Sequence, residues 1–184
     1  INEEEPATKD RDIETILQHF NLDIPYEDTF AFTRSQALRQ MQNESRGELI
    51  DTIISKVKKL EDQYDFTVIE GSDFLGEGTA FEFEANMAIA NNLSAPVIIV
   101  ISGQSKSIEQ IVSNVQTVLR NFLSHDVQVL AVVVNKVRKE MVDSVKELLA
   151  GELGLETLLS VIPKNKNLQN PTIKEIQEQI GGKL

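Results

Sequence analysis

Near the middle of the chain lies the apolar run Pro96-Val97-Ile98-Ile99-Val100-Ile101, which contains no charged residue. Residues 107–123 follow with apolar side chains at helical spacing, and residues 127–134 form a second apolar run. Continuous rather than alternating hydrophobicity is typical of strands in a parallel sheet whose faces are covered by helices. The run and its neighbours therefore predict a strand–helix–strand unit of an α/β fold.

The same alternation extends outward in both directions from this unit. It predicts an α/β fold with a three-layer, mostly parallel sheet and helices on both faces. Short β-branched or apolar runs give the strands, and amphipathic segments give the helices. We expect strands over residues 66–69, 96–101, 127–134 and 158–162, and helices over residues 10–20, 45–63, 81–92, 107–123, 139–149 and 171–180.

Composition narrows the classes of function. The chain has 184 residues, 41% of them hydrophobic, with a net charge of −11 and no cysteine. Disulfides and thiolate chemistry are excluded, and the acidic charge disfavours a surface for nucleic acid. No apolar run approaches the ~20 residues of a membrane span. We expect a cytoplasmic protein that binds neither nucleic acid nor membrane.

The two ends of the sequence suggest a fragment. The chain starts at Ile1, without an initiator methionine, and finishes at Leu184 without an obvious stop. We expect one α/β domain over residues 1–180, with 181–184 as the start of a linker. No Gly-Lys-Ser/Thr phosphate loop is present in the sequence. The strand that carries such a loop is expected to lie before Ile1.

Ligands of open parallel sheets bind beyond the carboxyl ends of the strands, which points to four places in the sequence. These are Glu70-Gly71, Ser102-Gly103, Asn135-Lys136 and Pro163-Lys164. Glu70 ends an apolar strand, and its carboxylate could bind Mg²⁺ directly or through water. The alternative is a charged residue at a solvated strand end.

Asn135-Lys136 closes an apolar strand and offers an amide with both donors and acceptors, which suits the edge of a nucleotide base. The pair is similar to the start of a guanine-reading Asn-Lys-x-Asp motif, but the fourth residue is Arg138 instead of an acid. Pro163 follows a strand directly, where an ordinary turn is the alternative interpretation.

Several segments resemble one family, in order along the chain. Asp65-Phe66-Thr67-Val68-Ile69-Glu70-Gly71 resembles a strand of dethiobiotin synthetases and their relatives. Residues 83–90, 95–100, 129–136 and 161–163 are similar to the N-terminal, dethiobiotin-synthetase-like domain of long bacterial phosphate acetyltransferases. The resemblance covers most of the chain and implies a fold of the P-loop NTPase type.

The resemblance also implies roles. Glu70 corresponds to a metal-site residue, and Asn135 and Pro163 to positions near a nucleotide base; Gly71 and Lys136 join them as candidate effector-binding residues. The domain is expected to regulate and assemble the enzyme, while an absent C-terminal domain of the same polypeptide moves the acetyl group between coenzyme A and phosphate. This implies that the fragment alone is inactive and needs no cofactor, that ATP with Mg²⁺ or another nucleotide is the effector, and that the protein is a homo-oligomer.

Two alternatives remain open from the residues. One is an ATP-dependent carboxylase or ligase of the dethiobiotin synthetase type, which would need a phosphate loop upstream of Ile1. The other is a partitioning-type ATPase or a structural module, because one fold supports many functions.

Overall fold

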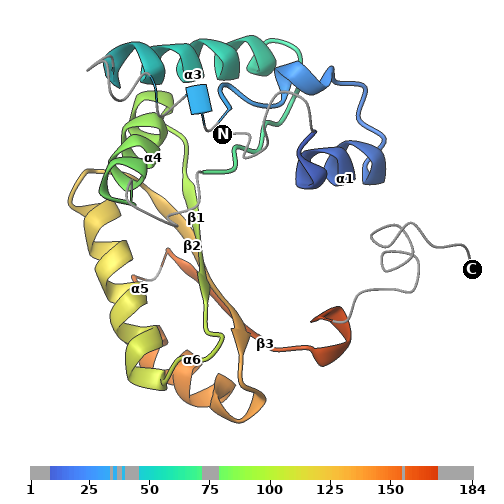
Figure 1. Ribbon diagram of the computed structural model, residues 1–184. Coiled ribbons are helices and arrows are strands. Elements are labelled where there is room, and N and C mark those ends of the chain that lie inside the picture. Colours follow the sequence, from blue (N-terminus) through green and yellow to red (C-terminus); the bar gives the residue numbers. More distant parts are fainter. Residues whose placement is uncertain are drawn as a thin grey trace, which may run out of the picture. The chain divides into compact units, whose positions relative to one another are not determined.

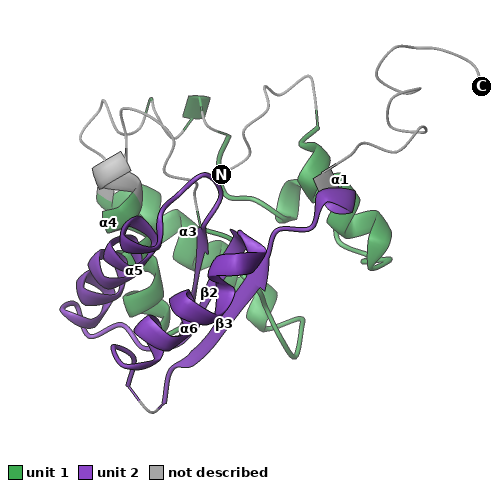
Figure 2. Ribbon diagram, turned by 90° about the horizontal axis from the view of Figure 1, so that it is seen from below, with its two compact units in different colours: residues 1–95 green, residues 96–184 purple. Residues whose placement is uncertain are grey.

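The computed structural model describes residues 9–33, 35–36, 39, 46–71, 79–154 and 156–169. The chain divides into two compact units, residues 1–95 and 96–184 (Figure 2). The first unit is mostly helical in its described part, and the second holds a parallel sheet. The helix expected over 171–180 and the linker expected over 181–184 lie outside the described residues.

The helices expected in the first unit are confirmed, with small shifts at their ends. They are α1 (Arg11–His19), α3 (Arg46–Glu61) and α4 (Thr79–Leu93), with the short 3-10 helix η1 (Tyr26–Asp28) between α1 and α3. Leu49 of α3 is buried and packs with Phe32 in a small hydrophobic core. Helices α3 and α4 contact each other.

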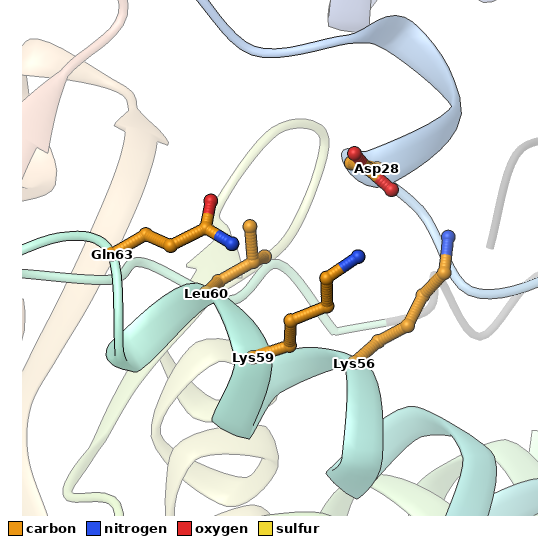
Figure 3. Close-up of a pocket in the computed structure, with 5 residues that line it drawn as sticks. All are labelled: Asp28, Lys56, Lys59, Leu60 and Gln63. Atoms are coloured by element: carbon orange, nitrogen blue, oxygen red, sulfur yellow. The ribbon is translucent and has the colours of Figure 1, made fainter.

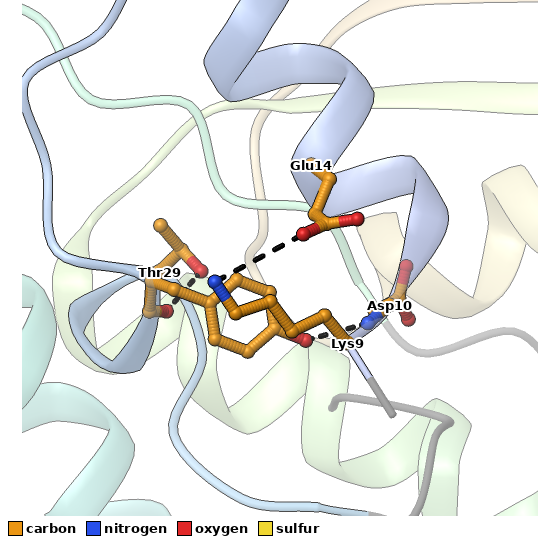
Figure 4. Close-up of polar contacts among 5 residues, drawn as sticks. Lys9, Asp10, Glu14 and Thr29 are labelled. Atoms are coloured by element: carbon orange, nitrogen blue, oxygen red, sulfur yellow. Dashed lines mark hydrogen bonds and ion pairs between the residues drawn. The ribbon is translucent and has the colours of Figure 1, made fainter. Parts of the chain in front are cut away.

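Tyr26 of η1 is hydrogen-bonded to the start of α1. Figure 4 shows Lys9, Asp10 and Glu14 at this helix start. Asp10 caps α1, because its side chain accepts hydrogen bonds from the backbone amides of Asp12 and Ile13. The Asp10 amide donates to the Tyr26 hydroxyl at 2.7 Å. Lys9 lies 3.9 Å from Glu14 and 5.2 Å from the centre of the Tyr26 ring. These contacts fix the entry to α1 against a residue 16 positions further along the chain.

Lys56 links α3 to the segment of residues 27–30 through hydrogen bonds. Its ammonium donates to the carbonyl oxygens of Glu27 at 2.6 Å and Phe30 at 2.7 Å. Lysines on a helix surface ordinarily belong to a solvated face. The side chain instead satisfies two loop carbonyls, which otherwise would have only water as a partner.

The strand expected over residues 66–69 is a wrong prediction. In the structure this segment forms no strand. Phe66 is 83% exposed and Val68 is 80% exposed. The Thr67 hydroxyl is buried and has no hydrogen-bond partner among the described residues. A β-branched run becomes a strand only when a neighbouring strand receives its backbone hydrogen bonds, and no such ladder forms here.

The second unit contains the expected parallel α/β arrangement, which confirms the fold class. Strand β1 (Val97–Ser102) is followed by α5 (Ile108–Leu123) and by strand β2 (Val129–Val137). The two strands pair in parallel from Val97 opposite Val129 to Ser102 opposite Asn135. Parallel pairing with an intervening helix is the unit predicted from the apolar runs.

The chain then adds a third strand to the same sheet. A short 3-10 helix η2 (Lys139–Met141) leads into α6 (Val142–Ala150), and β3 (Leu158–Pro163) pairs in parallel with β2. The strand order is β1-β2-β3 (Figure 1). A last 3-10 helix, η3 (Lys166–Gln169), follows β3.

The two faces of this sheet differ within the second unit. Helix α5 contacts β1 and β2, and α6 contacts β3. Ile99, Val132 and Val134 are buried, whereas the alternate residues Ile98 and Val100 are 56% and 65% exposed. Helices α5 and α6 therefore cover one face. Helices on the second face stay a prediction.

Candidate functional site

The carboxyl ends of the three strands are tied together by backbone hydrogen bonds. Ser102 lies opposite Asn135, and the Gly103 amide donates to the Asn135 carbonyl at 2.7 Å. On the other side of β2, the Lys164 amide donates to the Val137 carbonyl, also at 2.7 Å. Three of the four strand ends singled out in sequence therefore lie along one edge of the sheet.

Asn135 is held in place by both its backbone and its side chain. Its side-chain oxygen accepts a hydrogen bond from the Lys136 amide at 2.8 Å, and the residue is half-buried. Among the described residues no partner receives the side-chain NH₂. An amide in this state keeps two donors for a ligand while its acceptor is already partly used.

Lys136 has a left-handed backbone conformation, with φ of 60°. A side chain with a Cβ at such a position costs roughly 1–2 kcal/mol relative to the right-handed region. Strain of this kind gathers at functional sites, where the surrounding structure holds it in place. Sequence reasoning missed it, because a lysine gives no sign of a positive φ. An Asn directly before it, whose short side chain bonds the next amide, was the available signal.

The loop between β1 and α5 packs tightly against the end of β2. A Cβ atom added at Gly103 would lie 2.8 Å from Val137 Cγ2 and 3.2 Å from Ile111 Cδ1. Both of those side chains are completely buried. Gly103 is therefore needed for close approach of the loop.

Helix α5 begins at this loop with a capping box. The Ser107 hydroxyl accepts from the Gln110 amide at 3.3 Å, and the Gln110 side chain accepts from the Ser107 amide at 2.9 Å. A hydrogen bond from Ser107, together with one from the backbone, lowers the pKa of the exposed Glu109 carboxyl. The cap fixes the start of the helix at the sheet edge.

The other predicted site residues are exposed. Pro163 is the last residue of β3 and lies opposite Val137. Glu70 and Gly71 belong to the first unit, and both are exposed. A Cβ atom at Gly71 would lie 2.8 Å from the side-chain nitrogen of Asn86 in α4. The side-chain amide of Asn86 therefore lies directly against this glycine. Asn86 was not recognised from sequence as a neighbour of the Glu70 segment.

The described residues contain no group of three or more acidic, histidine or cysteine side chains that could hold a metal ion. The role of Glu70 at a metal site stays a prediction. In the same part of the chain, none of the helices combines the length and apolar character that crossing a bilayer requires.

A small pocket lies in the first unit, with a volume of ≈ 80 Å³. Figure 3 shows Lys56 and Lys59 of α3 pointing toward Asp28 of η1, with Leu60 and Gln63 completing the lining. Because the Lys56 ammonium already bonds two carbonyl oxygens, the pocket is best explained as part of the contact between α3 and the loop. The candidate site is therefore the carboxyl edge of the sheet.

Comparison with known proteins gives a consistent result. The profile of a family described as AAA domain matches residues 3–172. A phosphate acetyltransferase of Nitratidesulfovibrio vulgaris is 35% identical over 190 residues, which cover 100% of this chain and 27% of that protein. A phosphate acetyltransferase of Synechocystis is 29% identical over 168 residues, which cover 91% of this chain and 24% of that protein.

The chain thus spans about a quarter of the length of these curated relatives. No solved structure matches it. The resemblance seen in residues 65–71, 83–90, 95–100, 129–136 and 161–163 is confirmed at the level of family and relatives.

Proposed function

We propose, on the premise that this chain belongs to the AAA domain family, that it is a regulatory and assembly region of a phosphate acetyltransferase. One observation carries the proposal: the whole chain aligns with about a quarter of a relative named phosphate acetyltransferase. In this proposal the transfer of acetyl between coenzyme A and phosphate takes place elsewhere in the polypeptide. This region senses an effector and contributes contacts for assembly.

The carboxyl edge of the sheet is the proposed effector site. The Asn135 amide donors and the exposed Lys136 lie at the strand ends, where ligands of parallel sheets bind. A nucleotide-type effector offers both base edges and phosphates to such groups. Separately, Glu70 of the first unit is the proposed metal-site residue, since a carboxylate oxygen is a ligand that Mg²⁺ accepts.

The assembly role is supported by the face of the sheet that neither α5 nor α6 covers. Ile98 and Val100 of β1 are more than half exposed, as is Leu158 of β3 at 66%. Exposed apolar side chains that gather on one face are typical of protein–protein contacts. In this proposal the face packs against another part of the polypeptide or another subunit, which fits a homo-oligomer.

The proposal is tested in an intact phosphate acetyltransferase that contains this region. Acetyl transfer is measured across an ATP–Mg²⁺ titration for the unmodified enzyme and for Asn135→Ala and Glu70→Gln. We expect unchanged activity without effector and an effector midpoint shifted by about five- to tenfold, the effect of one lost hydrogen bond or charge contact. Asn114→Ala, which removes an exposed amide in the middle of α5, is the matched control.

Identical effector curves for both site variants and the control would contradict a nucleotide site at these residues. An intact enzyme whose activity is unaffected by deletion of residues 1–184, at any effector concentration, would contradict the regulatory role itself.

A further inference from the structure

Basic residues in the second unit gather at one end of the sheet. Residues 96–169 contain eight lysines and arginines. Five of them follow the carboxyl end of a strand within four residues, and a sixth, Lys136, is the residue before the last one of β2. The exceptions are Arg120, in the last turn of α5, and Lys146, within α6. The six residues of this set, called the basic edge below, are Lys106, Lys136, Arg138, Lys139, Lys164 and Lys166.

The strand pairing brings the three loops that carry these residues side by side. Neighbouring strands lie ≈ 4.7–4.9 Å apart, and here their ends are joined by the bonds from Gly103 to Asn135 and from Lys164 to Val137. Lys136 stands directly on the edge, with its backbone held by the Asn135 side chain. The basic edge is therefore built from three loops on a hydrogen-bonded frame.

The basic edge is positively charged, whereas the chain as a whole has a net charge of −11. Residues 1–95 hold 8 basic and 20 acidic residues, whereas residues 96–184 hold 10 basic and 9 acidic ones. Arg138 lies 3.9 Å from Glu140, an exposed contact. No ion pair within the described residues involves Lys136, Lys164 or Lys166. Adjacent cations without acidic partners repel one another, and an anion bound between them relieves that repulsion.

We propose that the basic edge binds a small anion that carries at least two linked phosphates. Lysines on separate loops act as point charges, and a chain of phosphates reaches several of them at once, which one carboxylate or one phosphate does not. The inference rests on the proposed function and deepens it. It adds that the phosphate chain of the effector, and not the base alone, is recognised at this edge.

The test is calorimetric titration of the chain with sodium tripolyphosphate, with inorganic phosphate as the short probe. We expect saturable binding of tripolyphosphate, at least about tenfold tighter than that of phosphate, and weaker binding at higher ionic strength. The double variant Lys136→Glu/Lys164→Glu is expected to lose about tenfold or more, since two exposed charge contacts become repulsive. Arg120→Glu is the matched control and is expected to bind within about twofold of the unmodified chain.

Thermal unfolding of each variant shows whether it folds, and Lys136→Gln/Lys164→Gln replaces the glutamate pair if that pair does not. Absence of tripolyphosphate binding, or equal losses in the double variant and the Arg120 control, would overturn the inference. Poly-glutamate binding as tight as that of tripolyphosphate would overturn it too, in favour of an acidic protein partner.

These outcomes are separable from the proposed function. In one outcome, ATP changes the rate of acetyl transfer equally in the intact enzyme and in its double lysine variant. In that case the basic edge does not bind the phosphates of the effector, and the regulatory role stands. If tripolyphosphate binds as expected but no effector changes acetyl transfer, the regulatory role fails and the anion site stands.

Discussion

Similar apolar segments adopt different structures in the two units of the chain. Residues 97–101 lie in β1, which pairs with β2 along its whole length, with Ile99 buried on one side. Residues 66–69 are equally β-branched and apolar, yet they form no strand and leave Phe66 and Val68 exposed. The difference is the presence of a partner strand, since both runs have comparable propensity.

The comparison shows that an apolar, β-branched composition is not enough to form a strand, and that a partner strand is also required. In the second unit each strand is followed by a helix and then by the next strand, so partners are close along the chain. In the first unit α4 follows residues 66–71, and no partner strand is described there. The second unit should therefore carry most of the measurable stability of the described fold.

The largest expected difference between the units is in core truncation. Ile111 of α5 is completely buried, so Ile111→Ala is expected to lower the free energy of unfolding by about 2–5 kcal/mol. Phe66→Ala, at an 83% exposed residue, is expected to change it by no more than about 0.5 kcal/mol. Urea unfolding followed by circular dichroism measures both. A loss at Phe66 as large as that at Ile111 would show that the 66–69 segment is covered in solution and would break the comparison.

The next largest effect is expected from alanine substitution at Gly103, after β1, and at Gly71, after the 66–69 segment. Gly103→Ala places a Cβ against the buried Val137 and Ile111 side chains and is expected to cost about 1–3 kcal/mol of unfolding free energy. Gly71→Ala meets the end of the Asn86 side chain, which can move, so we expect a loss below about 1 kcal/mol. Asn86→Ala/Gly71→Ala should restore part of that smaller loss. Equal losses at the two glycines would show that the Glu70 segment is packed as tightly as the sheet edge.

The next comparison is between two helix N-caps, one in each unit, in which a side-chain oxygen accepts backbone hydrogen bonds. Ser107→Ala at α5 and Asp10→Ala at α1 each remove a side-chain cap and are expected to cost about 1 kcal/mol. Chemical denaturation at a series of pH values separates them. The pKa of Glu109 is lowered from 4.5, chiefly by Ser107, so the stabilisation from this contact is present above pH 4.5 and is lost as the pH falls through the lowered value. The penalty of Ser107→Ala should therefore shrink in acid, and a penalty independent of pH would contradict the Ser107–Glu109 contact.

The smallest expected effect concerns the strained residue at the site. Lys136 has φ of 60°, so Lys136→Gly is expected to raise the free energy of unfolding by about 0.5–1 kcal/mol while it weakens binding of tripolyphosphate. Lys139→Gly, in η2, removes the same charge without relieving a positive φ and is expected to be slightly destabilising. Thermal unfolding of the two variants checks this. A stability loss at both positions would mean that the left-handed conformation is not maintained in solution.

The sequence predicted the elements better than it predicted the site. Hydrophobic periodicity located α1, α3, α4, α5, α6 and the three paired strands, because continuous apolar runs and amphipathic helices follow directly from burial. The strand over 66–69 was predicted wrongly, since pairing depends on a distant segment and not on the run itself. The edge position of Asn135 and Pro163 followed from the parallel topology.

Some features of the structure, at the site and elsewhere, could not be predicted from the sequence. The positive φ of Lys136, the contact of Gly71 with Asn86 and the two carbonyl bonds of Lys56 depend on three-dimensional packing. The lysines of the basic edge can be read in the sequence, but only the register of β1, β2 and β3 shows that they lie on one edge.

The central claim is that a nucleotide-type effector binds at the carboxyl edge of the second unit. Hydrogen–deuterium exchange of the chain, with and without saturating ATP and Mg²⁺, tests it most directly because it reports on individual loops. We predict slower exchange in residues 102–107, 135–139 and 163–166, with no change in the amides at the opposite end of the strands. Unchanged exchange in these three loops, or protection confined to residues 1–95, would contradict the claim.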